Sequence, residues 1–198
     1  MCGDFSHHSR FKFIKRKIEN GELIKILTIG RLVEEKGHKY AIKTIAKVIR
    51  KHKNIEYIIA GDGPLKDKLK SLVLELGIGR YVRFSEAVEQ NDVLKLYQQA
   101  HIFILPSIIA SNGATEGQGL VIQETHASGV PFISTLIGGI PEGVLNGKSG
   151  FLVPEKDVDA LAERLEYLIG YPEKWAEMGR YGRNYVEEKY DISKLNQK

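Results

Sequence analysis

Two apolar patterns alternate along the chain. Short runs rich in β-branched residues read as buried strands, at residues 24–29, 55–60, 81–84, 102–105, 131–134 and 150–153. Between them, apolar residues recur at helical spacing, which predicts helices in residues 42–49, 65–76, 93–100 and 158–169 and from Pro172 towards Tyr190. Strands and helices that alternate with short connections form right-handed βαβ units. The sequence therefore predicts an α/β fold, a Rossmann-like, doubly wound parallel sheet of about six strands with helices on both faces.

The size and composition of the chain agree with one such domain. It has 198 residues, of which 42% are hydrophobic and 27% charged, as in ordinary globular proteins. Residues 1–22 show no clear period, so we expect a lead-in or interdomain linker there and the domain in residues 23–198. The one cysteine, Cys2, excludes an internal disulfide and favours a reducing compartment, so we expect a cytoplasmic protein. No apolar stretch approaches the ~20 residues of a membrane span.

Positive charge is concentrated in the first quarter of the chain. Residues 1–54 hold 14 Lys and Arg against 5 Asp and Glu (net +9), and the rest hold 15 against 20 (net −5). An anionic ligand is therefore expected to bind there. A solvated basic face is one alternative, and a membrane-surface patch formed by residues 10–17 is another. Nucleic acid is disfavoured, because aromatic and basic residues are not interleaved in this quarter.

In a doubly wound sheet, ligands bind beyond the carboxyl ends of the strands, so the loops there are the candidates. The first such loop, residues 30–37, carries Arg31 and Lys36. Two cations at this place can hold a phosphate or a diphosphate. The alternative is that both are exposed and pair with Glu34 or Glu35. In the next loop, residues 61–64, we expect Asp62 to cap the helix that follows.

The longest loop runs from Pro106 to about Gly119 and opens a helix at about Leu120. A glycine-flanked helix start offers unpaired N–H groups to an anion. Glu116 and Glu124 flank this start, eight residues apart, a span of at most about 12 Å at helical rise. A carboxylate accepts hydrogen bonds from two neighbouring hydroxyls, so one acid is expected to bind a sugar and the other a ribose, with a diphosphate between them. Each is also compatible with an ordinary surface carboxylate near a helix start.

Other site chemistries have little support in the sequence. The six histidines show no metal-ligand spacing on one helix face. Asp157 precedes a predicted helix and is expected to cap it. No Walker loop or nucleophile elbow is present, and no GxGxxG follows the first strand. The glycine pair Gly138 and Gly139 reads as a tight turn.

Several motifs together resemble a known family. In order they are Gly30-Arg-Leu32, Glu35-Lys-Gly37, Ala60-Gly-Asp-Gly-Pro64, Leu105-Pro-Ser107, Glu116-x7-Glu124, Gly138-Gly-Ile-Pro-Glu142 and Gly150-Phe-Leu-Val-Pro154. Their order and spacing resemble the C-terminal, nucleotide-sugar-binding domain of retaining GT-B glycosyltransferases of family four (glycosyl transferases group 1). The resemblance covers roughly residues 23–192. It implies that the chain is one half of a GT-B enzyme, without the N-terminal acceptor domain.

The resemblance also implies roles for individual residues. The catalytic residues would be Arg31, Lys36 and Glu116. The donor-binding residues would be Gly30, Val88, Gln118, Gly119, Leu120 and Glu124, with Ala87 and Val88 near the base. Two departures bear on the sugar pocket: Gln118 stands where the family commonly has Phe, and the loop of residues 108–115 is long.

The implied substrates are a UDP-, GDP- or ADP-sugar and a saccharide or lipid-linked acceptor. No metal, no cofactor and no nucleic acid are implied, whereas peripheral membrane contact of the full-length enzyme is. We expect weak donor binding and little or no transfer by this chain alone. Two alternatives are a nucleotide-sugar epimerase-like GT-B domain and a non-catalytic, flavodoxin-like phosphate- or nucleotide-binding module.

Overall fold

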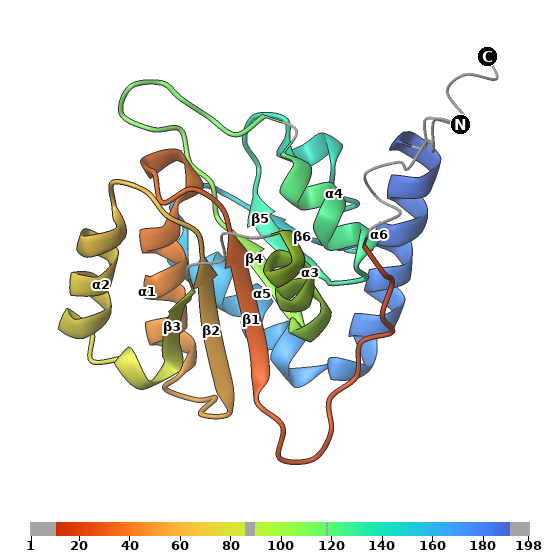
Figure 1. Cartoon of the computed structure of the whole chain (residues 1–198), viewed down its shortest axis with the longest axis horizontal. Coiled ribbons are helices and arrows are strands. Elements are labelled where there is room, and N and C mark those ends of the chain that lie inside the picture. The colour runs from red at the N-terminus through yellow and green to blue at the C-terminus, as the bar shows by residue number, and fades with distance from the viewer. Residues whose placement is uncertain (1–10, 86–89, 118, 191–198) are drawn as a thin grey trace.

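The computed structural model describes residues 11–85, 90–117 and 119–190 (Figure 1). Six strands form one sheet in the order β3–β2–β1–β4–β5–β6, and every pairing is parallel. The strands are β1 (Ile24–Ile29), β2 (Ile55–Ala60), β3 (Val82–Ser85), β4 (Ile102–Leu105), β5 (Phe132–Thr135) and β6 (Gly150–Val153). The predicted fold class is confirmed. The strand order reverses between β1 and β4, and doubly wound sheets bind their ligands at such a switch point, beyond the carboxyl ends of the strands.

Helices cover both faces of the sheet. They are α1 (His38–Val48), α2 (Lys66–Glu75), α3 (Gln90–Gln99), α4 (Leu120–Ala127), α5 (Val158–Gly170) and α6 (Trp175–Tyr190). Short 3-10 turns are η2 (Glu34–Lys36), η3 (Gly79–Tyr81), η4 (Ile140–Glu142) and η5 (Pro172–Lys174). Side chains alternate along a strand, so Ile26 faces the core under α1, α2 and α5, whereas Leu27 faces the core under α3 and α4. Both residues are fully buried.

Helix α6 begins beside α5, where Trp175 is buried in the core that lies under α1, α2 and α5. It then packs along α4. The seam between α4 and α6 depends on glycine. A Cβ atom on Gly179 would lie 2.3 Å from the backbone oxygen of Gly129, and one on Gly182 would lie 2.5 Å from Nδ1 of His126. Neither Gly179 nor Gly182 could carry a side chain here, so α6 packs closely against α4 and the residue pair that follows it.

The two predicted helix caps have different outcomes. Asp157 caps α5, since its carboxylate accepts from the N–H groups of Asp159 at 3.1 Å and Ala160 at 2.9 Å. The prediction for Asp62 is wrong: the N-cap of α2 is Leu65, without a side-chain bond. The loop after β2 extends to Leu65, so Asp62 is three residues before the N-cap position. The Asp62 carboxylate instead lies 3.4 Å from Nζ of Lys66.

The basic lead-in packs against the domain from residue 11 onward. Its Arg16 side chain is 5% exposed and donates to the carbonyl oxygens of Tyr97 at 2.9 Å, Gln98 at 2.6 Å and Ser128 at 2.7 Å. These carbonyls lie at the C-terminal ends of α3 and α4, where the helix dipole favours a cation. Burial lowers the pKa of Arg16 to about 10. Arg16 is therefore a structural residue and does not belong to a surface patch.

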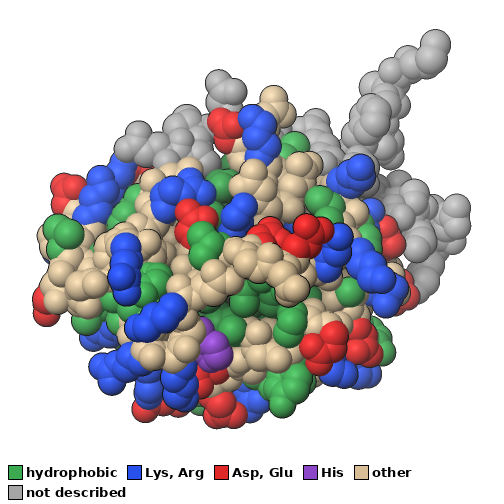
Figure 2. Space-filling view, turned by 90° about the horizontal axis from the view of Figure 1, so that it is seen from below, with side chains coloured by type: hydrophobic (Ala, Val, Ile, Leu, Met, Phe, Trp, Pro, Cys, Tyr) green, Lys and Arg blue, Asp and Glu red, His purple; other side chains and the backbone are tan. Residues whose placement is uncertain are grey.

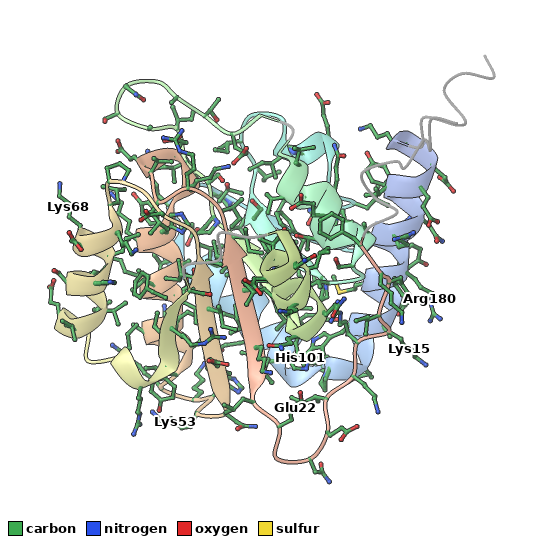
Figure 3. All side chains as sticks on the ribbon, in the orientation of Figure 1. Lys15, Glu22, Lys53, Lys68, His101 and Arg180 are labelled. Carbon is green, nitrogen blue, oxygen red and sulfur yellow. The ribbon has the colours of Figure 1, made fainter. Side chains whose placement is uncertain are left out.

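The remaining basic residues described in this segment are exposed, at positions 12, 15 and 17. Lys15 is labelled in Figure 3, on the side of the molecule that carries α6. Seen from the end at which the strands begin, basic and acidic side chains are interspersed over much of the surface (Figure 2). Across the described ranges, no helix is both long and apolar enough to cross a membrane.

Candidate functional site

Two loops meet at the switch point between β1 and β4, at the top of Figure 1. One follows β1 and spans residues 30–37, and the other follows β4 and spans residues 106–119. They touch backbone to backbone: a Cβ atom on Gly37 would lie 1.8 Å from the carbonyl oxygen of Pro106. Gly37 has a φ of 64°, in the left-handed region, and it ends η2 and begins α1. This glycine therefore allows both the turn and the close contact of the loops.

The β1–α1 loop is supported from below by the loop after β2. A Cβ atom on Gly61 would lie 2.1 Å from the carbonyl oxygen of Gly30, and the N–H of Leu32 donates to the Asp62 carbonyl at 2.9 Å. Leu32 itself is fully buried. The glycine motif after β2 thus serves as packing for the first loop, which it holds rigidly at the edge of the sheet.

Lys36 forms an ion pair with Glu116, which is 80 residues away in the sequence. Both side chains are mostly buried, with 19% of Lys36 and 9% of Glu116 exposed. The aliphatic part of Lys36 passes over Gly30, where an added Cβ atom would be 3.8 Å from its Cδ and Cε atoms. The alternative that Lys36 pairs with Glu34 or Glu35 is wrong. The lysine instead joins the two loops that meet at the switch point.

Glu34 has a separate function in this arrangement. Its carboxylate accepts from the Ser111 hydroxyl at 2.7 Å and from the Ser111 N–H at 3.2 Å, and these hydrogen bonds lower the pKa of Glu34. The backbone N–H of Ile108 also donates to the Glu35 carbonyl at 2.9 Å. The long loop after β4 is therefore tied to η2, the turn that carries Lys36.

The backbone of Glu116 is held by the glycine pair after β5. The N–H of Gly139 donates to the Glu116 carbonyl at 3.2 Å, and a Cβ atom on Gly138 would lie 2.1 Å from that same oxygen. The turn predicted from these glycines is present, and its position against Glu116 was not foreseen. It fixes the place from which the Glu116 carboxylate extends towards Lys36.

The Glu116 carboxylate also lies beside the start of α4. A Cβ atom on Gly119, the N-cap residue, would be 3.0 Å from Oε1 of Glu116. Within the part of the chain that the structure describes, the N–H groups of Gly119 and Leu120 have no hydrogen-bond acceptor. Leu120 is 60% exposed. The helix start thus presents free donors and the positive end of the helix dipole next to the Lys36–Glu116 pair.

Glu124 lies further along α4 and faces α3. Its carboxylate accepts from the Tyr97 hydroxyl at 3.1 Å. Tyr97 is fully buried, and burial raises its pKa well above the usual value, so the hydroxyl remains a donor. The carboxylate is therefore oriented by a rigid partner that sequence reasoning did not identify.

Arg31 follows Gly30 in the β1–α1 loop, and its side chain is exposed. No side-chain partner of its guanidinium is found among residues 11–85, 90–117 and 119–190. Val88, with its neighbour Ala87, and Gln118 lie outside the described residues. The structure thus brings together Gly30, Lys36, Glu116 and Gly119 and turns Glu124 towards α3. Arg31 lies in the same loop as Lys36, and among the described residues its side chain forms no hydrogen bond or ion pair with this group.

Sequence reasoning missed the residues that hold this arrangement, namely Glu34, Ser111, Tyr97 and the backbone contacts of Gly138 and Gly139. Their partners are distant in sequence, so local patterns carried no signal for them. In the described ranges, no three His, Cys, Asp or Glu side chains are grouped as a metal site would require.

The fold defines the class of this protein. It has the architecture of a Rossmann-like domain of the GT-B glycosyltransferases. The C-terminal domain of LpcC, a glycosyl transferase group 1 family protein from Francisella tularensis, superposes with a TM-score of 0.79 at 21% identity, over 93% of this chain and 98% of that one. The HepE protein of Anabaena, solved in complex with UDP-glucose, gives a TM-score of 0.77 at 23% identity, over 88% of this chain and 47% of that one.

The chain belongs to the family described as glycosyl transferases group 1, whose pattern matches residues 9–185. A curated relative is the GDP-mannose-dependent alpha-(1-6)-phosphatidylinositol monomannoside mannosyltransferase of Mycolicibacterium smegmatis. It is 31% identical over 162 residues, which are 81% of this chain and 42% of that protein. The chain thus spans about two-fifths of the length of the curated relatives it matches. The resemblance found in the motifs is confirmed.

Proposed function

We propose that the chain binds a nucleotide-diphospho-sugar where the two loops meet at the switch point between β1 and β4, as the donor half of a glycosyltransferase. The contact that carries this proposal is the Lys36–Glu116 pair beside the N–H groups at the start of α4, which have no acceptor among the described residues. A lysine ammonium has three donors, so Lys36 can hold Glu116 and a phosphate oxygen together. The diphosphate would lie between this lysine, the exposed Arg31 and the helix start, all of which favour negative charge.

The two acids would then bind the ends of the donor. The Glu116 carboxylate lies beside the start of α4, so we assign it to hydroxyls of the transferred sugar. Glu124, held by Tyr97, is assigned to the ribose hydroxyls. During transfer, Arg31 and Lys36 would stabilise the negative charge that develops on the departing nucleoside diphosphate. We propose retention of configuration and transfer to a saccharide or lipid-linked acceptor, with the acceptor bound by a further domain.

Relatives and structural neighbours support the choice of ligand class, and they differ in the nucleotide. HepE was solved with UDP-glucose, and the mycobacterial relative is named for GDP-mannose. A panel of UDP, GDP and ADP with their sugars is therefore the direct test, read by titration calorimetry. One set of runs in a divalent cation and one in a chelator test the proposed independence of metal.

The deciding variant is Arg31→Ala. We expect one nucleotide class to bind and this variant to weaken its affinity by roughly 10- to 100-fold, the size of a lost hydrogen bond to a charged group. The matched control is Lys53→Ala, which removes an exposed cation at the other end of the molecule (Figure 3). It should leave affinity unchanged. If no nucleotide binds, or if Arg31→Ala binds as well as the unaltered chain, the proposed site is wrong.

A further inference from the structure

His38 is buried directly behind the loop that carries Arg31. It is the first residue of α1, and only 1% of it is exposed. Its Nε2 atom lies 2.8 Å from the carbonyl oxygen of Arg31. The side chain thus reaches back from the helix to the loop, seven residues earlier in the sequence.

The hydrogen bond defines the state of the ring. A carbonyl oxygen only accepts, so Nε2 must carry the hydrogen. Burial lowers the pKa of His38 to about 4, with a further lowering from the nearby Lys36 charge, so the ring is neutral at neutral pH. Nδ1 then holds a lone pair, and it has no partner among the described residues. The hydrogen bond from Nε2 to the Arg31 carbonyl is thus the one that the ring makes within the described residues.

The Arg31 carbonyl receives two hydrogen bonds. Besides His38, it accepts from the backbone N–H of Val33 at 3.0 Å, which closes a tight three-residue turn around the buried Leu32. Both lone pairs of the oxygen are then used, and the orientation of the peptide group after Arg31 is fixed. Consequently the direction in which the Arg31 side chain leaves the backbone is fixed as well.

We propose that His38 is a positioning residue for the donor diphosphate, and that it acts through Arg31. The guanidinium has no side-chain partner among the described residues, so only the backbone orients it before the ligand arrives. The neutral imidazole supplies that orientation without adding a charge beside Lys36. This inference rests on the proposed function, because it concerns the cation that holds the diphosphate there.

The test compares His38→Leu and His38→Gln by titration calorimetry with the nucleoside diphosphate that the unaltered chain binds. Leucine has a similar volume and no donor, whereas the amide nitrogen of glutamine can take the place of Nε2. We expect His38→Leu to weaken affinity about three- to tenfold, as for the loss of one neutral hydrogen bond, and His38→Gln to restore most of it. All measurements are made well below the melting temperature of each variant.

A double-mutant cycle with Arg31→Ala separates the possible causes. If His38 acts through Arg31, His38→Leu should have no further effect on affinity in the Arg31→Ala background. A merely structural histidine would lower the melting temperature and leave affinity unchanged, which would overturn the inference. An equal loss in both backgrounds would overturn it too. Failure of the proposed function is distinguishable, since Arg31→Ala by itself would then have no effect.

Discussion

Two cations from the basic first quarter of the chain, Arg16 and Lys36, are both mostly buried but have opposite surroundings. Arg16 is enclosed by three backbone carbonyls at the C-terminal ends of α3 and α4. Lys36 is paired with a carboxylate from another loop, beside N–H groups of Gly119 and Leu120 that have no acceptor among the described residues. The Arg16 guanidinium already has three acceptors around it. Beside Lys36, in contrast, donors remain that an anion can accept from.

The difference shows that regional charge does not locate a site. Residues 1–54 have a net charge of +9, from 14 basic and 5 acidic residues, and both cations contribute to it. What separates them is which end of the sheet they reach. Arg16 meets helix C-termini, which attract cations, whereas Lys36 lies at the switch point beside a helix N-terminus, which attracts anions.

The largest expected effect is on stability, in Arg16→Met. Methionine keeps much of the buried volume but leaves three carbonyls without their charged donor. We expect the free energy of unfolding to fall by about 3 kcal/mol, measured by urea denaturation. Nucleoside diphosphate affinity should stay unchanged in the folded protein. Lys17→Met is the control, since Lys17 is 77% exposed and should change stability by less than about 0.5 kcal/mol. Equal effects of the two substitutions would break the comparison.

The next effect is expected in Lys36→Met, which alters both stability and binding. It leaves the Glu116 carboxylate mostly buried without its cation, at a cost of about 1–2 kcal/mol in unfolding free energy. Affinity for the nucleoside diphosphate should fall roughly 10- to 100-fold. Adding Glu116→Gln should restore most of the stability and none of the affinity. If affinity returns with stability, Lys36 only supports the fold, as Arg16 does.

The smallest effect concerns pH. His38 lies behind the loop of residues 30–37, and His126 lies between α4 and α6. Burial lowers the pKa of each of them to about 4. The unfolded histidines titrate near 6.5, so between pH 6.5 and 4 the unfolded state binds more protons than the folded state. Stability should therefore fall as the pH drops through this window. Denaturation at pH 6.5 and 5 measures the effect, and a chain carrying His38→Gln and His126→Gln should show a flatter dependence.

Much of the fold could be predicted from local patterns. A strand buried on both faces leaves a short apolar run in the sequence, and a helix buried on one face leaves a period of 3.6. The strands and the helices could therefore be predicted, with shifts at their ends. The third strand, for example, begins at Val82 and the first helix at His38. The cap at Asp157 was found because its partners are two and three residues away. The cap predicted at Asp62 was wrong because the glycine motif does not indicate at which residue the next helix begins.

The site was predictable only in part. Arg31, Lys36, Glu116 and Gly119 were selected because loops after parallel strands converge at one edge of the sheet. The ion pair that the structure shows joins Lys36 and Glu116, which are 80 positions apart in the sequence. It depends on backbone approaches at Gly37 and Gly138 that no spacing rule contains. The contribution of His38 was likewise invisible, since a histidine after a loop has many possible partners.

By itself, then, the sequence determined the layers of this protein, the edge at which we propose that a ligand binds and the residue types available there. These follow from periodic burial and from the handedness of βαβ units, which are local and general. The tertiary structure alone decided that Arg16 is enclosed by backbone carbonyls and that Lys36 lies at the switch point beside the start of α4. That choice depends on which helix end each side chain meets, and helix ends are brought to a side chain only when the whole chain has folded.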